Sequence, residues 1–317
     1  MEGASRVSVN SAEMRTVAVV LPTLNAAAFL PQLIDTLSRQ SLRPKAIVLV
    51  DSSSTDGTAE LARAAGWIVE VIPRQSFRHG ATRHYATGLV GADVYVFLTQ
   101  DALPAADDSV ERLVDALYAE PDLGVVFGRH LPRPGCSPIA AHNRLFNYPA
   151  KSQTKRLGDA ARLGLKTCFS SDVFAAYRAD ALRAVGSFPR HVIGCEDVHV
   201  AARMQKAGYA VGYVAEAQVF HSHDHGLLQD FRVFFDIGAF YSRDSWILTE
   251  FGKMEGEGIE YLVSEIRFLI ENKMSRFIFL SLLTLGVKYF GFILGRHSKI
   301  IPNLIRRKLS SFPSYWD

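Results

Sequence analysis

The chain has few cysteines and no strong charge of either sign. Its three cysteines, Cys136, Cys168 and Cys195, are widely spaced and form no CxxC pair. This excludes a disulfide scaffold and a zinc finger, and it favours a reducing compartment. A net charge of +3 gives no reason to expect a nucleic-acid partner. Over the 317 residues, 48% are hydrophobic and 21% are charged, which is typical of a globular protein.

Several common motifs are also missing. The sequence contains no GxxxxGK loop, which argues against a P-loop nucleotide site. No GxGxxG follows the first predicted strand and no GxSxG elbow is present, which argues against a dinucleotide site and an α/β-hydrolase. No secretory signal opens the chain, and we expect residues 1–15 to be a flexible N-terminus.

The first half of the chain alternates strand and helix patterns. Apolar runs typical of buried parallel strands occur at Val17–Leu21, Ile47–Val50, Val69–Ile72, Val94–Leu98 and Val125–Gly128. Helical spacing of apolar residues separates several of them. We interpret 130–166 as a loop because of its four prolines, and we expect late strands at 211–214 and 217–220. The order predicts an α/β fold with a mostly parallel central sheet over residues 16–225.

Residues 226–317 are predicted to form a helical, basic C-terminal region. From Asn272 onward there are eight Lys or Arg residues and one acid, Asp317. The uncharged run from Phe277 ends at Lys288, which leaves it short of the roughly 20 residues that a membrane-spanning helix needs. The pattern favours a helix lying on an anionic membrane surface. A buried core helix and a true span remain the alternatives.

Four polar clusters follow predicted strands. They are Pro22–Asn25, Asp51–Thr58, Gln100–Asp101 and His221–His223. Each cluster alone has the composition of a turn or helix cap. Because ligands of open α/β sheets bind beyond the carboxyl ends of the strands, four such clusters predict one ligand site at that edge.

These motifs resemble the inverting glycosyltransferases of family 2, which have the GT-A fold. The matching segments are VVLPTLN (19–25), DSSSTDGT (51–58), TQDALP (99–104) and Glu196-Asp197 with the later His221. The segment FRHGATR (77–83) and the closing Leu309-Ser310 and Tyr315-Trp316 resemble the rhamnosyltransferase branch, which builds O-antigens and other bacterial surface glycans. The resemblance implies a GT-A catalytic domain followed by a C-terminal helical extension.

The resemblance implies a nucleotide-sugar donor, for which dTDP-L-rhamnose is the expected compound and a UDP- or GDP-sugar the alternative. Asp51 would accept a hydrogen bond from a pyrimidine N–H. Arg83 and Arg78 would meet the diphosphate, which suits the planar fork of guanidinium donors. The implied donor-binding residues are Pro22, Thr23, Asn25, Asp51, Ser53, Arg78, His79, Arg83, Gln100 and Asp101.

A divalent metal is also implied. Asp101 resembles the surviving member of the family's Asp-x-Asp motif, with Thr99 in place of the first Asp, and His221 resembles the late His that completes the coordination. One carboxylate with diphosphate oxygens suits Mg²⁺ or Mn²⁺. His221, His223 and His225 would share one face of a strand, so a hydrolytic zinc site is the alternative.

The resemblance makes Asp197 the general base that takes the proton of the acceptor hydroxyl, with Glu196 beside it. An ordinary helix N-terminus would also favour a carboxylate there. Ser171 and Asp172 are expected at the acceptor and sugar site. The implied acceptor is a lipid-linked glycan, and the enzyme would sit peripherally on the cytoplasmic face of the bacterial inner membrane. A non-catalytic, membrane-anchored sugar-nucleotide-binding protein is the alternative from another class. The oligomeric state is left open.

Overall fold

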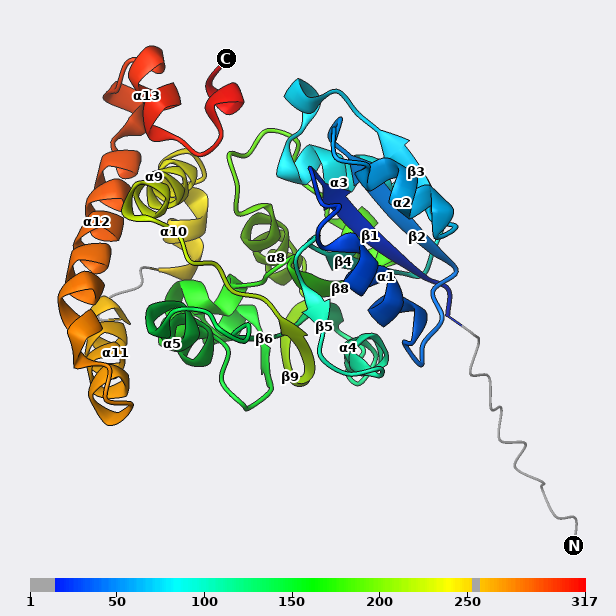
Figure 1. Ribbon diagram of the computed structural model, residues 1–317, viewed down its shortest axis with the longest axis horizontal. Coiled ribbons are helices and arrows are strands. Elements are labelled where there is room, and N and C mark those ends of the chain that lie inside the picture. The colour runs from blue at the N-terminus through cyan, green and yellow to red at the C-terminus, as the bar shows by residue number, and fades with distance from the viewer. Residues whose placement is uncertain (1–14, 253–256) are drawn as a thin grey trace, which may run out of the picture.

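The computed structural model describes residues 15–252 and 257–317. Within them, a nine-stranded sheet has the order β3-β2-β1-β4-β8-β6-β9-β5, with β7 paired to β9. Figure 1 shows the C-terminal helices gathered at the side of the molecule away from β3. The predicted flexible N-terminus lies outside the described residues except for Arg15.

The first four strands form where apolar runs predicted them. They are β1 (Val17–Thr23), β2 (Ala46–Asp51), β3 (Ile68–Val71) and β4 (Val94–Leu98), and they pair in parallel. The connecting elements are α1 (Leu30–Ser38), α2 (Thr58–Ala64), the 3₁₀ turn η1 (Arg74–Ser76) and α3 (His79–Thr87).

The second half of the sheet is mixed. β8 (Phe174–Arg178) runs antiparallel between β4 and β6 (Leu123–Leu131). The short strands β5 (Leu103–Pro104) and β7 (Gln153–Lys155) run antiparallel to β9 (Ala210–Phe220). Four of the eight pairings between described strands are parallel and four are antiparallel. The α/β class is confirmed, and the sheet is mixed, with every antiparallel pair involving β8 or β9.

Two local predictions need correction. The late strands expected at 211–214 and 217–220 are one strand, β9, whose register against β6 shifts between Gly128 and Arg129 in a β-bulge. The segment 130–166, predicted as a loop, contains α5 (Pro138–Asn147). Ser137 caps this helix by accepting a hydrogen bond from the Ala140 N–H at 3.2 Å, and Pro138 occupies its first turn, where the missing N–H costs nothing.

The remaining elements before α9 are short and surround these strands. They are α4 (Ser109–Leu117), η2 (Leu157–Asp159), α6 (Ala160–Leu163), η3 (Gly164–Cys168), α7 (Ala179–Ala184) and α8 (Glu196–Lys206).

The core lies on both faces of the sheet, as β4 illustrates. Tyr95 and Phe97 belong to one buried apolar cluster, while Val94, Val96 and Leu98 belong to the other. Successive strand residues point to opposite faces, so a strand buried on both faces is apolar throughout. The first polar residues after Leu98 therefore stand at the edge of the sheet.

The C-terminal helices continue this body and share its core. They are α9 (Leu227–Arg243), α10 (Trp246–Phe251), α11 (Glu257–Glu271), η4 (Ser275–Phe277), α12 (Ile278–Arg296), η5 (Ser298–Ile300), α13 (Asn303–Leu309) and η6 (Pro313–Trp316). Phe235 of α9 and Trp316 of η6 lie in one buried cluster with Val198 of α8.

Glycines allow α9 and α12 to meet backbone to backbone, in what we call the α9–α12 seam. A Cβ added at Gly291 would lie 2.5 Å from the Phe231 carbonyl oxygen, and one at Gly295 would lie 2.0 Å from that of Phe235. Both distances are shorter than any contact that real Cβ atoms make. Small residues at such a seam permit the close approach of two helices.

Gly295→Ala is expected to lower the free energy of unfolding by about 1–3 kcal/mol, because the added methyl group forces the two backbones apart. Gly286→Ala on the outer side of the same helix meets no atom within 4 Å. It is expected to raise that free energy by about 0.5–1 kcal/mol, because alanine favours a helix over glycine. Urea denaturation of both variants measures the difference, and equal shifts would contradict the seam.

The opposite side of α12, which we call the outer face, is apolar and exposed. Phe279 is 78% exposed, Tyr289 67% and Phe290 62%. Among the described residues, Ser275–Arg296 is the one helical stretch long and apolar enough to cross a membrane, with a mean hydropathy of 2.0. The seam accounts for only one side of α12, so the core-helix alternative leaves the outer face unexplained.

Candidate active site

Sheet register brings two polar clusters to the same edge. Leu98 at the end of β4 pairs with Phe174 at the start of β8. Just beyond this pair, the Thr99 N–H donates to the Val173 carbonyl at 3.2 Å. The segments that carry Asp101 and Asp172 are therefore neighbours, because one leaves and the other enters the sheet at this point.

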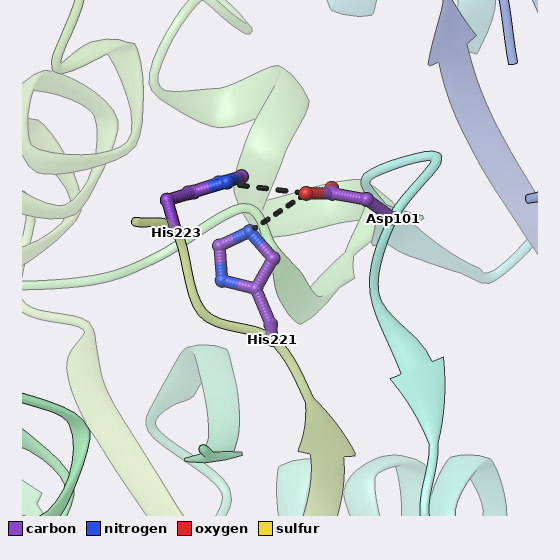
Figure 2. A group of neighbouring side chains, drawn as sticks. All are labelled: Asp101, His221 and His223. Carbon is purple, nitrogen blue, oxygen red and sulfur yellow. Dashed lines mark ion pairs between the residues drawn. The ribbon is translucent and has the colours of Figure 1, made fainter. Parts of the chain in front are cut away.

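The first cluster consists of Asp101, His221 and His223. Asp101 lies between β4 and β5, and the two histidines directly follow β9 (Figure 2). Both His Nε2 atoms lie 3.4 Å from the same carboxylate oxygen, Oδ2 of Asp101. One ligand atom from each residue falls within 4.8 Å of the others, so the three side chains are close enough to hold one metal ion.

The electrostatics of this cluster suit a cation. Burial lowers the pKa of His223 to about 4 and also lowers the pKa of His221, so both imidazoles are neutral at pH 7 and can offer a lone pair. Burial alone would raise the pKa of Asp101, but the two neighbouring imidazoles and the hydrogen bonds with His221 and Thr99 together outweigh burial and keep this carboxyl ionised. Two imidazoles and one carboxylate form a donor set that suits Mn²⁺ better than Mg²⁺, which prefers oxygen.

The His221 ring packs against a stacked pair of rings. The buried His130 imidazole stacks on Tyr148 at 3.9 Å and meets the His221 ring edge-on at 5.4 Å. Burial holds the pKa of His130 well below its usual value, so this ring stays neutral next to the cluster.

The three-histidine zinc alternative does not match the structure. β9 ends at Phe220, so the histidines do not share a strand face as predicted. His225 Nδ1 faces Asp230 at 3.5 Å instead of joining the cluster. His223, which was predicted as a ligand only within that alternative, lies beside His221 and faces Asp101.

A cavity of about 410 Å³ opens beside Asp101. Phe29, Gln100, Arg133 and Phe220 are among its lining residues. Arg133 donates to the Asp101 carbonyl and stacks over the Phe29 ring. Nothing in the sequence singles out this arginine, because it lies in the proline-rich segment interpreted as a plain loop.

The predicted nucleoside-binding residues form two interlocked loops after β1 and β2. Asp51 is 1% exposed and accepts hydrogen bonds from Thr23 Oγ1 at 3.3 Å and from the Ser54 N–H at 2.8 Å. Asn25 accepts from the Thr55 N–H at 3.1 Å. Asn25 and Ser53 both adopt positive φ angles, 49° and 57°. Asp51 therefore shapes its own turn, and its binding role stays a prediction.

The remaining donor-side residues of these loops lie next to them. Pro22 pairs with Val50 in the β1–β2 ladder, one residue before Thr23 pairs with Asp51. The side chain of Gln100 accepts from the Leu24 N–H at 2.8 Å and donates to the Leu24 carbonyl at 3.2 Å. Gln100 thus ties the first loop to the segment that carries Asp101.

Arg83 is buried among carboxylates. It belongs to α3, is 4% exposed, and its guanidinium forms ion pairs with Asp172 at 3.1 Å and with Glu196 at 2.8 Å. These ion pairs give Arg83 a structural role, and its contact with a diphosphate stays a prediction. Arg78 precedes α3 and donates to backbone carbonyls, while His79 Nδ1 lies 3.9 Å from Glu196.

The second cluster gathers three carboxylates around Arg83. Asp197 Oδ2 accepts from the Asp172 N–H at 3.3 Å, and Tyr177 donates to Asp172 Oδ1 at 2.7 Å. Cys195, with φ of 55°, turns the chain so that Glu196 and Asp197 open α8. The predicted acceptor residue Ser171 is buried next to Asp172.

Burial raises the pKa values of two carboxyl groups in this cluster. It raises the pKa of Asp172 to about 7, against the opposing effect of Arg83. Burial, followed by the charges of Glu196 and Asp172, raises the pKa of Asp197 well above its ordinary value. Asp172 and Asp197 therefore hold a proton more readily than exposed carboxylates, a property that suits proton transfer.

A buried lysine orders the loop leading into this cluster. The Lys155 ammonium donates to the carbonyls of Lys166 at 2.8 Å and Phe169 at 2.7 Å. Burial lowers the pKa of Lys155 to about 7. Lys155 thereby fixes the backbone just before Ser171.

Comparisons with known proteins agree on one family. Residues 18–186 match the model of glycosyl transferase family 2. The chain is 39% identical over 303 residues to the O-antigen chain rhamnosyltransferase RfbN of Salmonella typhimurium, covering 95% of this chain and 96% of that protein. It is 38% identical over 306 residues to the O-antigen chain rhamnosyltransferase WbaN of Salmonella anatum, covering 96% of each.

Solved structures show the same fold. The mannosyltransferase PcManGT from Pyrobaculum calidifontis, in complex with GDP-Man and Mn²⁺, superposes with a TM-score of 0.55 at 19% identity, covering 95% of this chain and 85% of that one. S. aureus TarS 1–349 superposes with a TM-score of 0.51 at 16% identity, covering 90% and 91%. At these identities the likeness concerns the fold alone.

Proposed function

Because the chain belongs to glycosyl transferase family 2 and is a glycosyltransferase, we propose that it transfers L-rhamnose from dTDP-L-rhamnose to a lipid-linked glycan in O-antigen synthesis. The observation that carries this proposal is the high identity to two O-antigen chain rhamnosyltransferases over nearly the whole of all three chains. The two clusters at one sheet edge supply the groups that such a transfer requires.

The chemistry assigned to this site is one inverting displacement. Asp197 takes the proton of the acceptor hydroxyl while the oxygen of that hydroxyl attacks the anomeric carbon of the sugar. The bond to the nucleoside diphosphate breaks in the same step, and the diphosphate leaves with the electron pair. Arg83 keeps Glu196 and Asp172 in place beside the base. Asp51 and Thr23 hold the nucleoside, as the resemblance implies.

We assign the metal site to Asp101, His221 and His223, with Mn²⁺ as the preferred ion. When bound, such an ion neutralises the charge that develops on a departing diphosphate. Arg133 lies beside Asp101 and adds a second positive charge at this edge of the cavity.

The donor assignment is tested by turnover. Purified protein with Mn²⁺ and a membrane-extracted lipid-linked acceptor is expected to consume dTDP-L-rhamnose faster than UDP- or GDP-sugars, by at least about tenfold. Release of the nucleoside diphosphate measures the rate. A faster reaction with a UDP- or GDP-sugar would overturn the donor but leave the family and fold unchanged.

We further propose that the enzyme rests on the cytoplasmic face of the inner membrane through the outer face of α12. Exposed apolar residues continue beyond α12. Ile300 at the end of η5 is 83% exposed, and Leu304 on α13 is 69% exposed. Arg306, Arg307 and Lys308 follow on α13. An apolar strip beside clustered cations fits an anionic lipid surface. The seam opposes a spanning position, since α12 would have to leave α9.

The membrane proposal is tested with Phe279→Asp and Tyr289→Asp combined. Removal of the whole tail is a poor test, because Trp316 and α12 contribute to the core. The double variant is expected to lose at least about tenfold in co-sedimentation with phosphatidylglycerol vesicles, because two exposed rings that would insert into the lipid are replaced by charged side chains. High salt should weaken wild-type binding.

Leu61→Asp is the matched control for this test. Leu61 is 38% exposed on α2, at the far side of the molecule from α12 (Figure 1). This variant is expected to bind vesicles as the wild type does. Unchanged binding of the double variant would contradict the proposal, and retention after a carbonate wash would indicate a spanning helix.

A further inference from the structure

The last residues of the chain, 310–317, form a short segment that we call the C-terminal clasp. Trp316 is buried next to Phe235 of α9, and Asn303 of α13 donates to the Trp316 carbonyl. The Ser311 N–H donates to Asp236 Oδ2 at 2.7 Å. Figure 1 shows the C-terminus between α13 and the end of the molecule that carries α3. The clasp is therefore anchored on the C-terminal helices.

The other side of the clasp contacts residues 74–79, which we call the donor arm. The Arg78 guanidinium donates to the Ser314 carbonyl at 2.6 Å and to Ser314 Oγ at 3.2 Å. The same guanidinium donates to the carbonyls of Gln75 at 3.1 Å and Phe77 at 2.8 Å. Arg78 thus holds the arm in its bent shape and joins it to the clasp, across 236 positions of sequence.

A ring contact extends this connection toward the carboxylate cluster. Phe312 meets the His79 ring edge-on, with centroids 4.7 Å apart and an interplanar angle of 88°. His79 Nδ1 lies 3.9 Å from Glu196 Oε1 and 3.5 Å from the Arg83 guanidinium. The clasp therefore contacts the one arm residue that touches both Glu196 and Arg83.

We propose that the C-terminal clasp completes the donor side of the active site. Phe312 and Ser314 are positioning residues that fix His79 and the arm for the nucleoside diphosphate sugar. Arg78 acts by fixing the arm, since its donors are already taken by carbonyl groups and Ser314. This inference rests on the proposed function for the identity of the donor, but not for the contact between clasp and arm.

Phe312→Ala tests the inference, and Phe312→Tyr is the conservative variant that keeps the ring. Loss of an edge-to-face ring pair is expected to raise KM for dTDP-L-rhamnose about 3- to 10-fold. Hydrogen exchange of the amides in residues 74–83 is expected to become faster, while Mn²⁺ affinity stays unchanged. Phe312→Tyr should restore both measurements.

Gln229→Ala is the matched control within the same region. It removes an exposed hydrogen bond to Ser311 Oγ at 3.4 Å, on the part of the clasp that does not touch the arm. Wild-type KM and exchange are expected for this variant, because an exposed hydrogen bond exchanges readily with water and contributes little. Folded Phe312→Ala with wild-type KM and wild-type exchange would overturn the inference.

A second variant keeps the inference falsifiable if Phe312→Ala does not fold. Arg78→Gln is expected to speed amide exchange in residues 310–317, and unchanged exchange there would overturn the inference. Hydrogen exchange is measured without any nucleotide-sugar donor. Failure of the wild type to use dTDP-L-rhamnose would therefore count against the proposed donor and not against the clasp.

Discussion

Asp197→Asn is expected to lower kcat roughly 10²- to 10⁴-fold, the usual contribution of a general base. The amide keeps the shape of the side chain but cannot take the proton of the acceptor hydroxyl. It can still accept from the Asp172 N–H, so the fold and donor binding should change little. Steady-state kinetics with saturating donor, together with calorimetry for dTDP, separate the two effects.

The pH profile gives this prediction a second measurement. Because burial and the neighbouring carboxylates raise the pKa of Asp197, the active carboxylate form is lost at a higher pH than for an ordinary Asp. Wild-type kcat should rise with pH through this raised pKa, and the rise should vanish in Asp197→Asn. Near-normal turnover of Asp197→Asn, with a large loss in Glu196→Gln, would transfer the role to Glu196.

The same cluster predicts how stability depends on pH. A carboxyl group whose pKa rises on folding binds protons more tightly in the folded state. For Asp172 the window lies between its ordinary pKa near 4 and about 7. The free energy of unfolding should therefore fall as pH rises through this window, opposite to the effect of a salt-bridged surface carboxylate.

Asp101→Ala is expected to abolish Mn²⁺-dependent binding of dTDP and to lower kcat about 10²-fold or more, because a bound cation contributes several kcal/mol to a charged transition state. The substitution removes the one oxygen ligand of the cluster that both imidazoles face. Calorimetry with dTDP, with and without EDTA, measures the metal-dependent part of the affinity.

His225→Ala is the control for this experiment. His225 stacks on His223 at 5.1 Å but faces Asp230 and lies outside the cluster. It should leave Mn²⁺-dependent binding near the wild-type value, whereas His223→Ala should weaken it. Wild-type activity that EDTA does not change would remove the metal from the proposal and leave Asp101 without this role.

The parts of the fold that the sequence predicts are those that leave a pattern in consecutive residues, such as an unbroken apolar run. The strand at Val94–Leu98 is buried on both faces, so it is apolar at every position. The polar residues that follow such strands stand at the sheet edge, which is why Asp101 and His221 could be predicted at one edge. Their pairing as metal ligands, 120 positions apart in sequence, was implied by the family resemblance and not by the strand pattern.

The parts that the sequence does not predict depend on contacts made by the whole fold. Helix α3 buries Arg83, a residue type that is seldom buried unless it is paired. Its carboxylate partners are Asp172 and Glu196, about 90 and 110 positions away in sequence, so nothing local predicts the burial. Strand β8 runs antiparallel to β4 and β6 within a pattern that predicts parallel strands, so its direction could not be inferred.

The α9–α12 seam has a consequence for which acceptors the enzyme can reach. Because Gly238, Gly291 and Gly295 bring the two helices into backbone contact, α12 could not shift against α9 without breaking that contact. If the outer face of α12 rests on lipid, as proposed, the catalytic edge would be held at one height and one tilt above the bilayer. A lipid-linked glycan would then be extended only when its free end reached that height, and a shorter or longer one would not reach the site. Selection among growing chains would follow from the stiffness of one helix pair, without any pocket that counts sugars.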